Sequence, residues 1–134
     1  MDKSIEEKFV NNFVVKDKRE RILHELNSKK KREIAMRRII PLLDKRFVVF
    51  EGQNADDNVL LAELKKYTKI PKTCYNISDS SDDGNILPLE IAIKNMLEYE
   101  MSYVIICDEN TVVASEEYEA PFGAPWRGIL HKKD

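Results

Sequence analysis

The stretch 102-SYVIICDENTVVAS-115 decides the fold, because it holds two β-forming runs separated by two residues. The runs are rich in β-branched and apolar side chains, and Glu109-Asn110 between them indicates a tight turn, so this stretch predicts a β-hairpin. Three other segments have the same strand character: 46-RFVVFEG-52, 72-KTCYNIS-78 and a last short strand at 127–130. We therefore expect a sheet of about five strands.

Two segments with apolar residues at helical spacing, 55–67 and 88–100, separate these strands. Pro88 is suited to the first position of a helix, where its missing N–H costs nothing, and Ile91, Met96 and Leu97 are expected to point inward. The order strand, helix, strand, helix, strand, hairpin predicts an α/β fold with a mixed sheet. In that sheet, helices join parallel pairs and the C-terminal hairpin is antiparallel.

The first third of the chain predicts three helices, at 4–14, 17–26 and about 28–39. Ser28 is a plausible N-cap for the third helix, with Ile34 and Ile39 facing inward, and Pro41 either kinks or ends it. No low-complexity linker follows, so we expect one domain over 1–134. It comprises a helical lobe at 1–46 packed on the mixed α/β sheet of 47–134.

Composition indicates a globular chain with a heavily charged exterior, since 43% of its 134 residues are hydrophobic and 34% are charged. No run of about eighteen apolar residues occurs, so no membrane span is predicted. The N-terminus lacks the apolar core of a signal peptide, which favours the cytoplasm. In such a compartment Cys74 and Cys107, each in an apolar stretch, are expected to be buried and reduced.

The net charge of −2 conceals a strong asymmetry. Residues 16–46 contain twelve Lys or Arg against five Asp or Glu, whereas residues 47–134 contain eight against sixteen. Two faces of opposite potential are therefore expected, and such faces affect the choice of partner more than the fold.

The segment 79–90 is close to a calcium-binding loop of the EF-hand type. The matching positions are Asp79, Ser81, Asp83, Gly84, Ile86 and Glu90. However, the preceding segment has strand character and a proline where an entering helix is required, and Leu87 stands where an oxygen ligand is usual. We favour a strand-to-helix turn in which the glycine has a positive φ, and we leave open whether this segment binds a cation.

No catalytic, cofactor or metal site is predicted, and we expect that the protein is not an enzyme. His24 and His131 belong to no recognisable nucleophile or metal spacing, and the four glycines do not form a phosphate-binding loop.

A basic cluster lies within 29-KKKREIAMRR-38. Its cations are Lys29, Lys30, Lys31, Arg32, Arg37 and Arg38. This cluster could contact the phosphates of RNA or DNA, or it could be a solvated face that the acidic part of the chain partly neutralises.

The acidic part of the chain could mimic the phosphates of a nucleic acid and so occlude a basic active site, or it could simply keep the surface soluble. The residues that we predict to bind such a partner are Asp79, Asp82, Asp83, Asp108, Glu109, Glu116, Glu117 and Glu119.

The segments 13-FVVKDKRERILHELNSKKKR-32, 74-CYNISDSSDDG-84 and 126-WRGIL-130 resemble those of small bacterial proteins of mostly unassigned function. In its size, its lysine- and asparagine-rich helices and its compact sheet, the chain is also similar to immunity proteins against contact-dependent growth inhibition toxins. That resemblance implies a cytoplasmic protein that binds and blocks a cognate toxin domain, often a nuclease. The alternative is a small RNA- or DNA-binding protein that uses the basic helix at 29–38.

Overall fold

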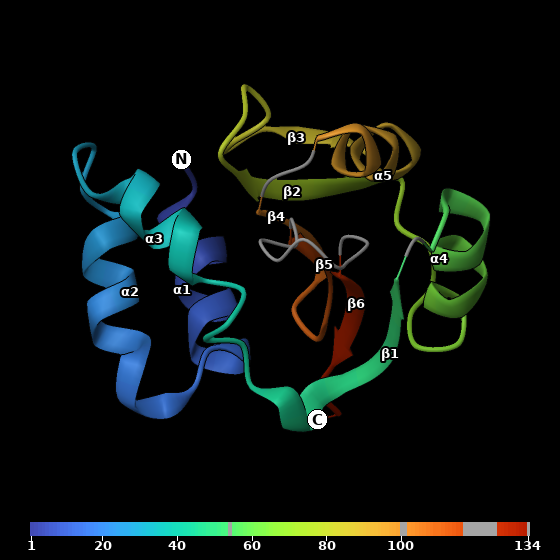
Figure 1. The fold of residues 1–134 in the computed structure, drawn as a ribbon, viewed down its shortest axis with the longest axis horizontal. Coiled ribbons are helices and arrows are strands. Elements are labelled where there is room, and N and C mark those ends of the chain that lie inside the picture. Colours follow the sequence, from blue (N-terminus) through green and yellow to red (C-terminus); the bar gives the residue numbers. More distant parts are fainter. Residues whose placement is uncertain (54, 100–101, 117–125, 134) are drawn as a thin grey trace.

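A six-stranded sheet forms the centre of the fold, with the strand order β1-β6-β5-β4-β2-β3 (Figure 1). The computed structural model describes residues 1–53, 55–99, 102–116 and 126–133. The strands are β1 (Val48–Gln53), β2 (Thr73–Ser78), β3 (Ile86–Pro88), β4 (Tyr103–Asp108), β5 (Thr111–Glu116) and β6 (Trp126–His131). The α/β class and the hairpin of β4 and β5 are confirmed.

The predicted mixed sheet is wrong, because every neighbouring pair of strands is antiparallel. Helix α4 (Asp57–Leu64) follows β1 and leads to β2, and α5 (Leu89–Glu98) connects β3 to β4. Each of these helices does join strands that run in the same direction. However, β2 lies between β3 and β4, and three strands lie between β1 and β2. The helices therefore cross over intervening strands, and no parallel pair forms.

The sequence does not predict the sixth strand, β3, because its three residues end at Pro88 and fall within the predicted strand-to-helix turn. Pro88 is in fact the residue before α5 as well as the end of β3. Since α5 begins at Leu89, its buried side chains are Leu89, Ala92, Ile93 and Met96. Ile91 lies off that stripe and is exposed, contrary to the prediction, whereas Met96 is buried and Leu97 is half-buried, as expected.

The N-terminal helices are α1 (Lys3–Phe13), α2 (Arg19–Leu26) and α3 (Arg32–Arg38). The carboxylate of Asp2 accepts from the backbone N–H groups of Ser4 and Ile5 and so caps α1. Helix α3 begins after the predicted cap Ser28, whose hydroxyl instead accepts from the N–H of Lys31 in the preceding turn.

The later start of α3 determines which of its residues face inward. Its buried residues are Arg32, Ala35 and Met36, and Ile39 just after the helix is also buried, so the inward stripe follows helical spacing. Ile34 lies outside that stripe and is exposed, contrary to the prediction. The helix ends before Pro41, one of the two outcomes expected.

Each face of the sheet is covered by its own layer of helices (Figure 1). Helices α1–α3 pack on the face that presents Tyr75, Ile77, Val104 and Ile106. Helices α4 and α5 pack on the opposite face, against Cys74, Tyr103, Ile105 and Cys107. The alternation of side chains along β2 and β4 thus supplies two separate cores. None of the described helices is long and apolar enough to cross a membrane.

Candidate functional site

In the loop between β2 and β3, two of the predicted binding residues, Asp82 and Asp83, point their carboxylates into the protein. The carboxylate of Asp83 accepts from Nε of Arg32 at 2.7 Å and from Nη2 at 2.9 Å, and it also accepts from the N–H of Ser78. The carboxylate of Asp82 accepts from the Tyr103 hydroxyl at 2.7 Å and from Nδ2 of Asn95 at 3.0 Å. Both carboxylates therefore have donors inside the fold and stabilise the loop.

Arg32 connects this loop to α1 through a buried ionic network. Its Nη1 and Nη2 donate to the two carboxylate oxygens of Glu6 at 2.7 and 2.6 Å, and the Tyr75 hydroxyl donates to the same carboxylate at 2.6 Å. Burial alone would lower the pKa of Arg32, but its hydrogen bonds to Glu6 and Asp83 raise the pKa above its ordinary value. The guanidinium is therefore a permanent cation between two carboxylates, and it holds the N-terminal helices against the sheet.

The same contacts bear on the calcium-like pattern of 79–90. Gly84 has a φ of +77°, as predicted for the turn, and Glu90 lies in the first turn of α5. The carboxylates of Asp82 and Asp83 point to different donors, while Asp79 uses its backbone carbonyl to accept from the Tyr99 hydroxyl. Within the described ranges, no three His, Cys, Asp or Glu side chains are grouped as metal ligands would be.

The turn between β4 and β5 presents a second acidic pair, and this pair is exposed. Oε1 of Glu109 accepts from Nζ of Lys8 at 2.8 Å, and its carbonyl accepts from Nδ2 of Asn12. The carboxylate of Asp108 accepts from the N–H of Asn110 and from the Thr68 hydroxyl. Of the other predicted binding residues, Glu116 ends β5, and Glu117 and Glu119 lie outside the described residues.

An apolar groove opens beside this turn, between α1 and the strands β2, β3 and β4. Its volume is about 280 Å³, and its apolar lining consists of Ile5, Phe9, Phe13, Tyr75, Ile86, Ile106 and Val112. Polar residues, Lys8, Asp108 and Glu109 among them, complete its wall.

The groove exists because the N-terminal helices stop short of the edge strand. Tyr75 on β2 is paired with Ile86 on β3, but Tyr75 is 3% exposed whereas Ile86 is 64% exposed. Sequence reasoning missed this site because it depends on β3, and a three-residue strand ending in proline gives almost no periodic signal.

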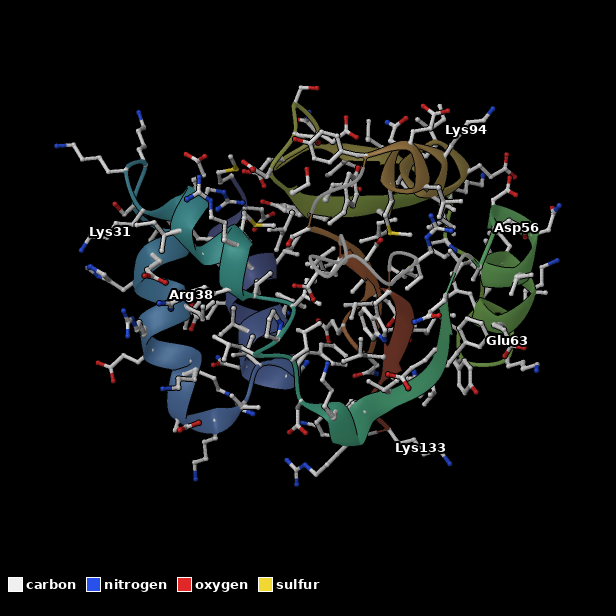
Figure 2. All side chains as sticks on the ribbon, viewed as in Figure 1. Lys31, Arg38, Asp56, Glu63, Lys94 and Lys133 are labelled. Carbon is white, nitrogen blue, oxygen red and sulfur yellow. The ribbon has the colours of Figure 1, made fainter. Side chains whose placement is uncertain are left out.

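The basic cluster is divided by the fold. Lys29, Lys30 and Lys31 are exposed in the turn before α3, and Figure 2 shows Lys31 extending away from the helical layer. Arg32 is buried, as described above. Arg37 and Arg38 each donate to a glutamate, Glu33 and Glu25 respectively, at 3.0 and 2.9 Å. Arg37 is nevertheless exposed, so the accessible part of the cluster consists of the three lysines and Arg37.

The histidines and cysteines are distributed over different parts of the fold. His24 is exposed on α2, and Nδ1 of His131 is 2.9 Å from the Thr111 hydroxyl at the end of β6. Cys74 and Cys107 are both free thiols and both are buried, as predicted. Burial raises the pKa of the Cys74 thiol to about 12 and also raises that of Cys107, so both are protonated at neutral pH.

Comparisons of the chain with protein-family models, with curated proteins and with solved structures gave no significant match. The resemblance to immunity proteins therefore stays a prediction.

Proposed function

We propose that the protein is an immunity protein that binds a cognate toxin domain and blocks its active site, and that the groove beside the Asp108-Glu109 turn receives the toxin. One observation carries the proposal: an open apolar groove with an exposed isoleucine lies next to an exposed acidic turn. This is the anatomy of a protein-binding surface, with an apolar centre that excludes water and a charged rim that orients the partner.

The charge of the rim favours a basic partner. Asp108 and Glu109 place two carboxylates against the single ammonium of Lys8, so the rim has an excess of negative charge. A nuclease binds the phosphates of its substrate with basic residues, and carboxylates held at its active site would compete with those phosphates for the same basic residues. Complementary charge of this kind also accelerates the encounter between two proteins.

The fold also revises which carboxylates to test. Asp82 and Asp83 already accept hydrogen bonds from Tyr103, Asn95 and Arg32, so changing them would disturb the loop as well as any interface. Asp108 and Glu109 lie at the surface, and Ile86 contributes an exposed apolar side chain beside them. These three residues give a cleaner test of binding.

The proposal is tested by searching the genes next to this one for a toxin-like domain and then by co-expressing that domain with the chain and titrating the purified pair in a calorimeter. The unchanged chain should protect the cell and form a one-to-one complex. Ile86→Asp should weaken the complex by at least about tenfold, because it places a charge in the apolar centre. Asp108→Lys with Glu109→Lys should slow association and make it less sensitive to salt.

Ile91→Asp is the matched control, because Ile91 is another exposed isoleucine but lies on α5, outside the groove. It should leave the affinity unchanged. If Ile86→Asp and Ile91→Asp bind the toxin domain equally well, the groove is not the interface. If the unchanged chain neither binds nor protects, the immunity function itself is refuted for that toxin.

The three exposed lysines at 29–31 support a second candidate function, which is binding to RNA or DNA. A protein that uses them should be retained on heparin at physiological salt, and changing all three to glutamine should abolish the retention. Complete flow-through of the unchanged chain would exclude this function.

A further inference from the structure

Cys74 and Cys107 face each other across two adjacent strands. Strands β2 and β4 are antiparallel, with Tyr75 opposite Ile106 and Asn76 opposite Ile105. Extending that register by one residue places Cys74 opposite Cys107. Side chains in this relation lie on the same face of the sheet, and both thiols belong to the core covered by α4 and α5.

The hydrogen-bonding pattern of β2 shows which kind of cross-strand pair this is. The N–H of Asn76 donates to the carbonyl of Asn85, and its carbonyl accepts from the N–H of Gly84, so the backbone of Asn76 points away from β4. Because this direction alternates along a strand, Cys74 also points away from β4, and its pair with Cys107 is of the non-hydrogen-bonded type. The Cα atoms of such pairs are about 4.5 Å apart, which is within the range found for disulfides.

The ladder between β4 and β5 is irregular at Cys107. The register between β4 and β5 shifts between Ile106 and Asp108, so Cys107 lies at an irregularity of the ladder. Such an irregularity disrupts the ladder only locally, and the register of β4 with β2 is regular up to Ile106.

The two thiols are well covered in the folded chain. The cysteines are only 4% and 8% exposed, and their side chains pack in the core under α4 and α5, on the face of the sheet opposite the groove. A small oxidant would therefore reach the sulfurs when that core opens locally, which makes the reaction slow.

We propose that Cys74 and Cys107 form a cross-strand dithiol site that a hydroperoxide oxidises to a disulfide between β2 and β4. This inference concerns the thiols alone and is independent of the proposed binding of a toxin.

The reaction needs two thiols and one peroxide. The sulfur of Cys74, as its thiolate, attacks one peroxide oxygen; the O–O bond breaks, and the products are a sulfenic acid on Cys74 and, after proton uptake, water. The sulfur of Cys107 then attacks the Cys74 sulfur, the S–O bond breaks, and a second water leaves. Two electrons pass from the sulfurs to the peroxide. The raised pKa values keep the thiolate scarce, so the site responds slowly at neutral pH.

The test treats the reduced, folded full chain with hydrogen peroxide at pH 8 and then counts alkylatable thiols after denaturation. The count should fall from two to none and return to two with dithiothreitol. After trypsin digestion, the fragment 73–94 should be linked to the fragment 95–127. Oxygen addition to the cysteines without this linkage, linkage only between separate molecules, or no loss of thiols would each overturn the proposal.

Phenylarsine oxide gives an independent reading of the same geometry in the unoxidised protein, because its arsenic bridges two neighbouring thiols with the loss of water. The unchanged chain should retain one equivalent of phenylarsine oxide per molecule of protein. Cys74→Ser and Cys107→Ser should each retain none, although each still has one buried thiol. Equal retention by the unchanged chain and the single variants would show that the two sulfurs do not act as a pair.

Discussion

The two acidic segments of the chain, the loop at 79–83 and the turn at 108–109, look alike in the sequence but have different roles in the fold. In the loop, Asp82 and Asp83 accept hydrogen bonds from distant side chains, Arg32 on α3 among them. In the turn, Glu109 is exposed and contacts Lys8 at the surface. Acidity along a sequence therefore does not by itself locate a binding surface; the location depends on which donors the rest of the chain brings to each carboxylate.

Arg32 accounts for most of this difference. A cation buried without partners is very costly, and the N-terminal helices bury this one beside the sheet. Glu6 approaches it from α1, and Asp83 approaches it from the loop. The acidic residues of the loop therefore neutralise a buried cation, whereas no comparable buried cation contacts the turn within the part of the chain that the structure describes.

The largest effect is expected when this cation is removed. Arg32→Met should destabilise the protein by about 3–5 kcal/mol, because it leaves the buried Glu6 carboxylate and that of Asp83 without their charged partner. The free energy of unfolding, measured with urea and followed by circular dichroism, tests this expectation.

Arg37→Ala is the control from the same helix. Arg37 pairs with Glu33 one turn earlier, both at the surface, so its loss should cost no more than about 0.5 kcal/mol. Comparable losses in the two variants would mean that Arg32 is no more than a surface ion pair, and the contrast between the two acidic segments would disappear.

The next largest loss of stability is expected when the Asp82 carboxylate is removed. Asp82→Ala should cost about 1–3 kcal/mol, because it leaves the buried hydroxyl of Tyr103 and the amide of Asn95 without their acceptor. Asp79→Ala should cost much less, since Asp79 uses its backbone carbonyl to bind Tyr99 and keeps that group in the variant. Equal losses in urea denaturation would show that the loop does not depend on the inward carboxylate.

Alkaline pH should destabilise the loop side of the comparison more than the turn, because Tyr75 is buried whereas Lys8, the group that titrates beside Glu109, is exposed. Burial, together with the hydrogen bond to Glu6, raises the pKa of Tyr75 from 10.0 to about 12. The folded state therefore keeps a proton that the unfolded state releases. This contribution to stability is complete below pH 10 and is lost progressively as the pH rises towards 12.

The urea midpoint should accordingly fall between pH 10 and pH 12, and Tyr75→Phe should make the decline shallower because it removes one of the titrating groups. The variant should also start from a lower midpoint at pH 7, since Glu6 loses a donor. An equally steep decline in both proteins would contradict the assignment to Tyr75.

The sequence predicts the α/β class and most elements because their patterns are local. The hairpin at 102–115, the strand at 72–78 and the three N-terminal helices each have a periodicity that does not depend on the rest of the chain. The pairing of the strands is different, because α5 has the same sequence whether it connects neighbouring strands or crosses an intervening one. The position of Ile86–Pro88 beside β2 decides between these outcomes, and that segment has no strong local signal.

The candidate site was only partly predictable for a related reason. Asp108 and Glu109 were identified because a charged turn between two strands lies at the surface in almost any arrangement. The groove beside them forms because α1 covers β2 but not β3. That arrangement depends on tertiary packing, so no local sequence pattern predicts it. The same holds for Arg32, which is one of the six cations within 29–38 in the sequence and becomes a buried residue only because Glu6 and Asp83 meet it.

The smallest effect, and the sharpest test of the comparison, is expected at the turn. Glu109→Gln removes the charge that Lys8 contacts, but both side chains remain largely in water, so the melting temperature should stay within about 2 °C of that of the unchanged chain. The combined Lys8→Met and Glu109→Gln variant should melt at the same temperature as either single variant. A loss of stability as large as that of Asp82→Ala would mean that the turn also uses its acid to hold the fold. In that event the rim of the groove would be structural, and its charge would no longer be evidence for a basic partner.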